Sequence, residues 1–278
     1  ATDSAAGLAH PAQQQRSDAT VVAANCARAQ EALRVLEEFG RSCDPELARV
    51  AEHCRYRLYD LATRLLADHS RRQRLAAERL YLITSPVPQL LAVVEQALQA
   101  GVKLVQHRSK LTDDLPRYQE AVALRDLCAA HGALFIVNDR VDLALAVEAD
   151  GVHLGQGDLP PAQARRLLGP DRLIGRSTHA PAQLQQAMAD GCDYAGVGPL
   201  QATPTKPGRE PVGLDYLRQA AQIATIPHYA IGGVDVQLLP ALLEAGGPHC
   251  RVAVVRAVME AADPAAAARQ LLELLADG

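Results

Sequence analysis

The spacing of hydrophobic residues along the chain changes near residue 77. Between Ser17 and Arg74, apolar residues recur at steps of three and four, which is the spacing of amphipathic helices. Asp44 followed by Pro45 is a typical helix start, because aspartate caps a helix and proline fits its first position. The sequence therefore predicts a helical hairpin, and the charged stretch 69–79 is expected to serve as a linker, the solvated end of a helix.

Beyond Leu80 the pattern changes to short apolar runs separated by longer helix-like stretches. Eight such units follow one another, which fits a TIM barrel better than an open doubly wound sheet. A glycine-rich dinucleotide-binding turn after the first run is missing, which also disfavours the doubly wound alternative. The predicted strands are 80–84, 102–108, 133–138, 151–155, 172–177, 194–198, 227–233 and 251–255.

The predicted fold class is therefore α/β, a TIM (β/α)8 barrel preceded by a small all-α helical domain. The expected domains are a flexible N-terminus over 1–16, a helical domain over 17–77 and the barrel over 78–278. In TIM barrels the chemistry takes place at the C-terminal ends of the strands. Polar residues at those ends are therefore the candidates for function.

The stretch GVKLVQHRSK places Gln106, Arg108 and Lys110 on one face of a strand, above the apolar Val102 and Leu104. The apolar pair is expected to fill the barrel and the polar residues to crown it. An arginine fork beside a lysine point charge suits a diphosphate. The alternative is a strand end whose exposed charges pair with neighbouring carboxylates.

Two carboxylates, Asp139 and Asp158, follow adjacent predicted strands, and Asn138 precedes the first of them. Together they can share a hard cation, and Mg²⁺ beside a diphosphate is the expected one. The alternative is that both aspartates cap the helices that follow. His153 lies inside its strand and is expected to be a packed, hydrogen-bonded residue rather than a metal ligand.

The fifth predicted strand ends in Ser177, with His179 two residues later. A serine beside a histidine suggests a hydrolase, but the chain has no nucleophile elbow and no evident third member of a triad. Ser177 is therefore expected to bind substrate through its hydroxyl, and His179 to begin a helix or to support the site from behind.

Two further segments supply candidate phosphate contacts. The loop 196–211 is rich in glycine, proline and threonine. Its residues Thr203 and Thr205 are expected to hold a phosphate, and Lys206 to neutralise the charge on a leaving group. The alternative is that the loop is only a proline-rich surface segment. Gly233 after the seventh strand, with the backbone of Val255 and Arg256 after the eighth, matches the common phosphate cup of this fold.

Composition narrows the class of protein. The formal net charge of −4 and the absence of tryptophan argue against nucleic-acid binding, so any anion site has to be a local cluster of cations. The six cysteines form no Cys-x-x-Cys pair, and no apolar run is long enough for a membrane helix. A cytoplasmic enzyme with small-molecule substrates is expected, without nucleic-acid or membrane partners, and a homo-oligomer is left open.

Taken together, the motifs of Leu80 to Val258 closely resemble the thiamine phosphate synthase family, and the ordered set is more specific than any single motif. The resemblance implies a TIM-barrel transferase of thiamine biosynthesis. Such an enzyme condenses hydroxymethylpyrimidine diphosphate with hydroxyethylthiazole phosphate, which yields thiamine phosphate and pyrophosphate with the help of magnesium. His107 departs from the family pattern, lies on the outward side of its strand and is expected to pack under a helix.

The resemblance also implies a role for each candidate. Gln106, Arg108, Lys110 and Asn138 would hold the pyrimidine diphosphate, with Asp139 and Asp158 as the magnesium ligands. Ser177 would lie near the pyrimidine and Lys206 at the diphosphate. Thr203, Thr205, Gly233, Val255 and Arg256 would bind the thiazole phosphate. Arg108, Lys110, Ser177 and Lys206 are the residues expected to act in catalysis.

The N-terminal segment resembles a helical domain fused ahead of the synthase in some bacteria, for which pyrimidine phosphorylation has been suggested. It contains no glycine-rich phosphate loop, so interaction with the barrel or stabilisation of it is the preferred interpretation. Three other functions are weighed for the whole chain: a thiazole tautomerase of similar fold, an unrelated phosphosugar barrel enzyme, and a catalytically silent protein that binds thiamine precursors.

Overall fold

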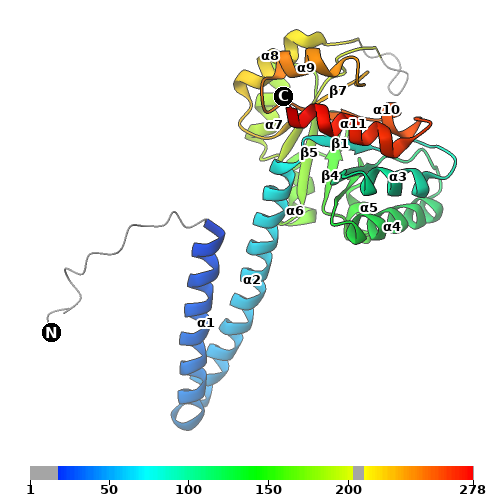
Figure 1. Ribbon diagram of the computed structural model, residues 1–278. Coiled ribbons are helices and arrows are strands. Elements are labelled where there is room, and N and C mark those ends of the chain that lie inside the picture. Colours follow the sequence, from blue (N-terminus) through cyan, green and yellow to red (C-terminus); the bar gives the residue numbers. More distant parts are fainter. Residues whose placement is uncertain (1–17, 203–209, 278) are drawn as a thin grey trace. The chain divides into compact units, whose positions relative to one another are not determined.

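A computed structural model of the protein describes residues 18–202 and 210–277 (Figure 1). Two long helices come first, α1 over Asp18–Cys43 and α2 over Pro45–Ala77, as predicted. By its internal contacts the chain divides into two compact units, Ala1–Ser70 and Arg71–Gly278. The division falls inside α2, whereas the boundary expected from the sequence, between residues 77 and 78, follows the end of that helix.

The turn between α1 and α2 is built by Asp44. Its Oδ1 accepts hydrogen bonds from the N–H groups of Glu46 and Leu47, both at 3.1 Å, so the predicted cap is confirmed. At this turn the two helices come close, because a Cβ on Gly40 would lie 2.9 Å from the backbone nitrogen of Ala48. Glycine is therefore required where the helices meet.

The second unit is a closed barrel of eight parallel strands, β1 to β8 in sequence order. All eight predicted strands are confirmed: β1 Leu80–Ile83, β2 Leu104–His107, β3 Leu134–Asn138, β4 Gly151–Leu154, β5 Leu173–Thr178, β6 Tyr194–Val197, β7 His228–Ile231 and β8 Arg251–Val254. The barrel closes where Leu80 of β1 pairs in register with Val252 of β8.

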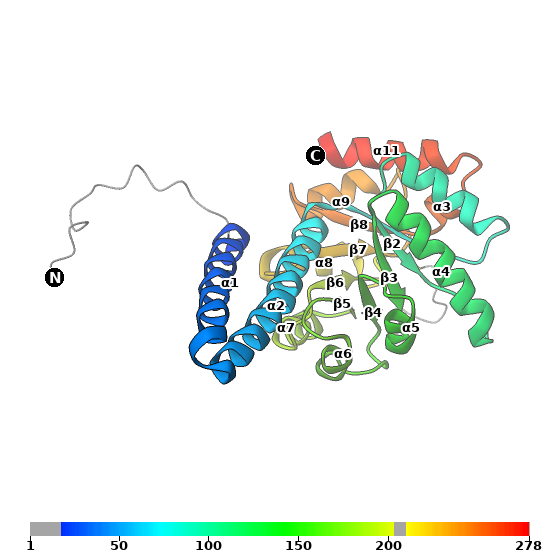
Figure 2. The ribbon, with the colours of Figure 1, turned by 90° about the horizontal axis from the view of Figure 1, so that it is seen from below.

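Helices surround the strands (Figures 1 and 2). α3 packs against both α4 and α11 on the outside of the barrel. No helix in the described ranges is long and apolar enough to cross a membrane. The helices of this unit are α3 Leu90–Gln99, α4 Asp114–Ala130, α5 Val141–Ala146, α6 Pro161–Leu168, α7 Pro181–Ala189, α8 Gly213–Ile223, α9 Leu239–Gly246, α10 Arg256–Met259 and α11 Pro264–Asp277.

Buried apolar residues form two clusters, one between strands and helices and one inside the barrel. Leu104 lies in the inner cluster, as predicted, but Val102 lies in the outer one. That part of the prediction is wrong because β2 begins at Leu104, and Val102 is still in the turn after α3, where its N–H donates to Ala97. His107 lies under α4 as predicted and pairs with Glu120 at 2.8 Å.

The charged stretch 69–79 contains the end of α2, as predicted, but from Arg71 onward it belongs to the barrel unit and is not a solvated linker. Arg71 pairs with Asp150 at 2.8 Å, and Arg72 pairs with Asp193 at 2.6 Å. Leu75 is 1% exposed and lies in the inner cluster of the barrel. The burial of Leu75 could not be predicted from the sequence, because a single leucine within a run of charged residues is the pattern of a solvated helix.

Two fragments test the contribution of residues 71–77. We expect the fragment 78–278 to unfold at least about 5 °C below the fragment 71–278, since losing one buried leucine costs about 2–5 kcal/mol. Thermal unfolding followed by circular dichroism gives the comparison, with Leu75→Ala in the longer fragment as the control. Equal unfolding temperatures for the two fragments would show that residues 71–77 do not stabilise the barrel.

Candidate active site

A cavity of about 390 Å³ opens at the C-terminal ends of the barrel strands. Residues of all eight strands line it, together with residues of the segments that follow β2, β5, β6, β7 and β8. Seven of the predicted site residues line it: Gln106, Arg108, Asn138, Ser177, Gly233, Val255 and Arg256. Residues that are more than 100 positions apart in the sequence therefore meet in one place, as the TIM-barrel prediction requires.

Three buried tyrosines form the floor of the cavity. Tyr81, Tyr194 and Tyr229 pack edge to face, with ring centroids 5.2 to 5.9 Å apart. The hydroxyls of Tyr81 and Tyr194 lie 2.8 Å apart, and Gln106 Nε2 donates to Tyr81 at 2.7 Å. Burial raises the pKa of Tyr81 and of Tyr194, so both hydroxyls stay protonated and remain available as donors.

The tyrosine floor continues into His153 and Ser177. His153 Nδ1 lies 3.2 Å from the Tyr194 hydroxyl, and His153 Nε2 lies 3.0 Å from Ser177 Oγ. The imidazole is 8% exposed, so the prediction of a packed, hydrogen-bonded histidine fits its surroundings. Ser177 therefore pairs with His153 of the neighbouring strand, and its hydroxyl is oriented from below.

Arg108 reaches the cavity from the segment after β2. Its backbone N–H donates to Thr84 Oγ1 at 2.9 Å, which fixes the start of that segment against the end of β1. Lys110, two residues further, is exposed and does not line the cavity. Of the two predicted cations, the structure thus brings Arg108 into the cavity and leaves Lys110 at the surface beside it.

The two predicted magnesium ligands follow neighbouring strands and also lie outside the cavity lining. Asp139 comes directly after β3 with a positive φ of 64°, and its N–H donates to the His153 carbonyl at 2.8 Å. Asp158 Oδ2 accepts from the Gly155 N–H at 2.6 Å, within the loop after β4. Neither helix that follows has a side-chain cap, so the capping alternative is wrong.

The fit to magnesium rests on these two carboxylates. Oxygen donors are what this cation prefers, and one or two carboxylates with phosphates and water are its usual set. In the described part of the chain no cluster of three or more histidine, cysteine, aspartate or glutamate residues could hold a metal. Asp139 and Asp158 are carboxylates of the kind that magnesium uses, and their role as its ligands stays a prediction.

A second polar region lies where β7 and β8 end. Gly233 has a φ of 75°, which favours glycine, and a Cβ there would lie 2.8 Å from the Gln201 side chain. Within the described ranges, no backbone hydrogen bond uses the N–H groups of Gly233, Val255 or Arg256. These three donors are suited to the oxygens of a monophosphate.

Thr203, Thr205 and Lys206 lie outside the described residues, so their predicted roles stay predictions. His179 lines the cavity two residues before α7, and its N–H donates to Gln183 Oε1 at 2.8 Å, consistent with the expected helix start.

Sequence reasoning missed several lining residues: Tyr81, Tyr194, Tyr229, Asp235 and Glu260. Strand parity offered a signal for one of them. Tyr81 begins an alternation that places Ile83 on the same inner side, and both lie in the inner cluster.

Comparison with known proteins decides the family. Thiamine monophosphate synthase is the family that matches residues 80–258. The thiamine-phosphate synthase of Synechococcus sp. (strain WH7803) is 56% identical over 284 residues, which cover 99% of this chain and 80% of the relative. That of Prochlorococcus marinus (strain MIT 9313) is 55% identical with the same coverage. The chain belongs to the thiamine monophosphate synthase family.

Family membership confirms the resemblance drawn from the motifs between Leu80 and Val258. It makes the chain a transferase of thiamine biosynthesis. The N-terminal segment is a separate match, because the ThiD2 family covers residues 1–64. The segment ahead of the synthase therefore matches a family of its own.

Solved structures agree with this assignment. Thiamine phosphate pyrophosphorylase from Pyrococcus furiosus is 34% identical, with a TM-score of 0.66, and the match covers 74% of this chain and 98% of that one. A 3-hexulose-6-phosphate synthase matches with a TM-score of 0.52 at 20% identity, which is a likeness of fold alone. The synthase family and the TIM barrel are thus supported by sequence and by fold.

Proposed function

We propose that the cavity at the C-terminal end of the barrel is where the chain joins hydroxymethylpyrimidine diphosphate to hydroxyethylthiazole phosphate. The products are thiamine phosphate and pyrophosphate. One observation carries the proposal: seven residues expected from the synthase motifs line a single cavity, although they come from five different strand ends. Pyrophosphate release from the two precursors, as opposed to binding alone, separates this function from that of a catalytically silent binding protein.

The diphosphate end of the site would be formed by Arg108, Lys110 and Asn138, with Lys206 from the loop after β6. Arg108 can grip two oxygens in a fork, and the lysines supply point charges. Asp139 and Asp158 would hold Mg²⁺, which when bound neutralises negative charge on the diphosphate. The support for this arrangement is that Arg108, Asp139 and Asp158 follow the neighbouring strands β2, β3 and β4.

The pyrimidine would bind over the floor of the cavity, where Gln106 and Ser177 offer polar groups. His153 orients the Ser177 hydroxyl at 3.0 Å, and Tyr194 holds the other side of the imidazole. The thiazole phosphate would take the cup formed by Gly233, Val255 and Arg256, with Thr203 and Thr205. The two substrates would then face each other across the cavity.

The reaction needs no side-chain nucleophile. The bond between the pyrimidine methylene carbon and the diphosphate oxygen breaks, and pyrophosphate leaves with the electron pair. The electron-rich aminopyrimidine supports the methylene cation, and the thiazole nitrogen donates its lone pair to form the new C–N bond. The protein contributes orientation and preorganised positive charge at the leaving group.

Magnesium dependence tests the roles of Asp139 and Asp158. We expect pyrophosphate release by the wild type to saturate with Mg²⁺, and Asp139→Asn and Asp158→Asn each to need at least about tenfold more Mg²⁺, because each loses an anionic ligand. Asp215→Asn, an exposed carboxylate on α8, is the matched control. Unchanged magnesium requirements in both site variants would remove these residues from the metal site.

The N-terminal unit has no assigned step in this reaction. A role in interaction or stabilisation stays the preferred interpretation, and its own activity in pyrimidine phosphorylation stays the alternative. A homo-oligomer and a cytoplasmic location also remain predictions.

A further inference from the structure

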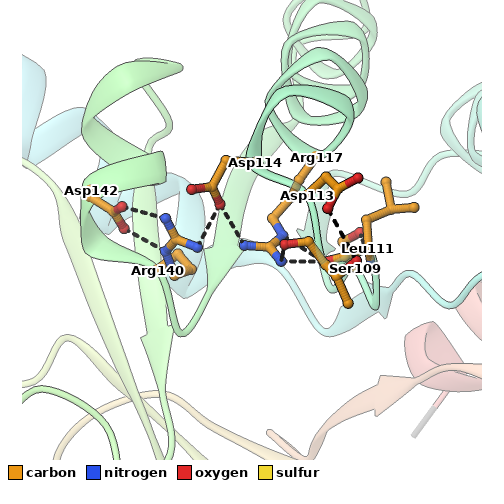
Figure 3. A network of polar contacts seen from close by, with 8 residues as sticks. Ser109, Leu111, Asp113, Asp114, Arg117, Arg140 and Asp142 are labelled. Atoms are coloured by element: carbon orange, nitrogen blue, oxygen red, sulfur yellow. Dashed lines mark hydrogen bonds and ion pairs between the residues drawn. The ribbon is translucent and has the colours of Figure 1, made fainter.

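A chain of four charged side chains joins two loops at the C-terminal end of the barrel (Figure 3). Its centre is Arg140, which makes a forked pair with Asp142: Nε donates to Oδ1 at 2.8 Å and Nη2 to Oδ2 at 2.5 Å. The remaining nitrogen, Nη1, donates to Asp114 Oδ1 at 3.0 Å. Arg140 therefore ties the start of α5 to the start of α4.

Asp114 passes the connection on to Arg117. The same oxygen, Asp114 Oδ1, accepts from Arg117 Nη1 at 3.1 Å. Arg117 then donates to two backbone carbonyls, from Nε to Leu111 at 3.0 Å and from Nη2 to Thr112 at 3.1 Å. These carbonyls come directly after Lys110, so the loop that carries Lys110 is held from its far side.

The other end of the network lies beside the proposed metal ligand. Arg140 directly follows Asp139, and its own N–H donates to the Asn138 carbonyl at 2.8 Å. None of Arg140, Asp114 and Arg117 lines the cavity. Their side chains thus connect the two substrate-binding loops from outside the site.

We propose that Arg140 is a positioning residue: through Asp114 and Arg117 it fixes the loop that carries Lys110 relative to the loop that carries Asn138 and Asp139. The groups that meet the diphosphate and its magnesium ion are then already in place before the substrate binds. This inference rests on the proposed function, because it assigns those two loops to the diphosphate.

The ion pairs of Arg140 are solvent-exposed, so they are expected to contribute little to the stability of the fold. The side chains of Arg140, Asp114 and Asp142 are 39%, 75% and 65% exposed, and ion pairs at such sites contribute about 0–1 kcal/mol to folding. The hydrogen bonds from Arg140 lower the pKa of Asp142 to about 2, so this pair stays charged at neutral pH. The network is therefore suited to order two loops without adding much to the stability of the barrel.

Binding of magnesium pyrophosphate, a product of the reaction, gives a readout that does not depend on turnover. By isothermal titration calorimetry on the full chain, we expect Arg140→Ala to raise the Kd for magnesium pyrophosphate about tenfold, because the loops must be ordered on binding. The unfolding temperature should stay within about 3 °C of wild type. In the steady state, the KM for the pyrimidine diphosphate should rise and the KM for the thiazole phosphate should not.

Two further variants sharpen the test. Arg218→Ala removes an ion pair of the same type, with Asp215 at 2.6 Å on α8, and is expected to bind as wild type does. Asp114→Asn keeps the shape of the bridging side chain but removes its charge, which weakens its hydrogen bonds to both arginines, and is expected to weaken binding in the same direction as Arg140→Ala. If Arg140→Ala lowers the unfolding temperature further than expected, its weaker binding could come from lost stability. The affinity of Asp114→Asn for magnesium pyrophosphate then decides whether Arg140 has the positioning role.

Each result has a defined meaning. Wild-type affinity in Arg140→Ala, or in Asp114→Asn where that variant decides, overturns the positioning role while the proposed function stands. A wild-type protein that does not bind magnesium pyrophosphate overturns both. Equal weakening in Arg218→Ala also overturns the positioning role, because loss of any surface charge would then have the same effect.

Discussion

Replacing Arg108 with alanine is expected to lower kcat for pyrophosphate release by about 10²- to 10³-fold, the usual cost of removing one preorganised donor at a developing charge. Arg108 is the one predicted cation of the strand β2 segment that lines the cavity. The fold should survive, because the contact that anchors this position is the backbone N–H of Arg108 to Thr84 Oγ1, which alanine keeps.

Arg108→Lys is the matched variant for this test. It keeps the charge and loses the fork, so its kcat should lie between those of the wild type and Arg108→Ala. Circular dichroism and thermal unfolding check that both variants fold. Near wild-type turnover in a folded Arg108→Ala protein would show that the diphosphate binds elsewhere.

Gly175→Ala is expected to destabilise the protein by at least about 3 kcal/mol, at the upper end of what overpacking costs. A Cβ at Gly175 would lie 2.1 Å from Cζ of Tyr194 and 2.6 Å from Nδ1 of His153. Neither ring can move aside easily, because Tyr194 is fully buried and hydrogen-bonded to Tyr81. Displacing His153 would also release Ser177, so the kcat of any folded fraction should fall.

The neighbouring strand supplies the control. A Cβ at Gly196 would meet His153 Cε1 at 3.5 Å, which is an ordinary van der Waals distance. Gly196→Ala should therefore change the free energy of unfolding by less than about 1 kcal/mol. Chemical denaturation of both variants measures the difference. Equal stability of Gly175→Ala and the wild type would mean that the inside of the barrel is looser than its hydrogen bonds indicate.

Much of the fold could be predicted from local patterns. The eight strands are predictable because parallel barrel strands are short apolar runs between turns, and the hairpin is predictable because Asp44 and Pro45 mark a helix start. The errors lie where a local pattern is overridden by distant contacts. Leu75 is surrounded by charges in the sequence, yet it is buried inside the barrel because Arg71 and Arg72 pair with aspartates of the barrel unit.

In the site, too, local patterns could be predicted and contacts between distant residues could not. Gln106, Arg108, Asn138 and Ser177 could be predicted because barrel chemistry gathers at strand ends. The hydrogen-bonded path from Gln106 through Tyr81, Tyr194 and His153 to Ser177 could not. This path depends on which strands are neighbours and on their register, and neither can be predicted from the local sequence.

The most direct test of the central claim is pyrophosphate release by the full chain, measured with the pyrimidine diphosphate, the thiazole phosphate and Mg²⁺ and with each of them omitted in turn. We predict rapid release only when all three are present, with one thiamine phosphate formed for each pyrophosphate. No release with all three present, or release that does not depend on the thiazole phosphate, would contradict a condensation in this cavity.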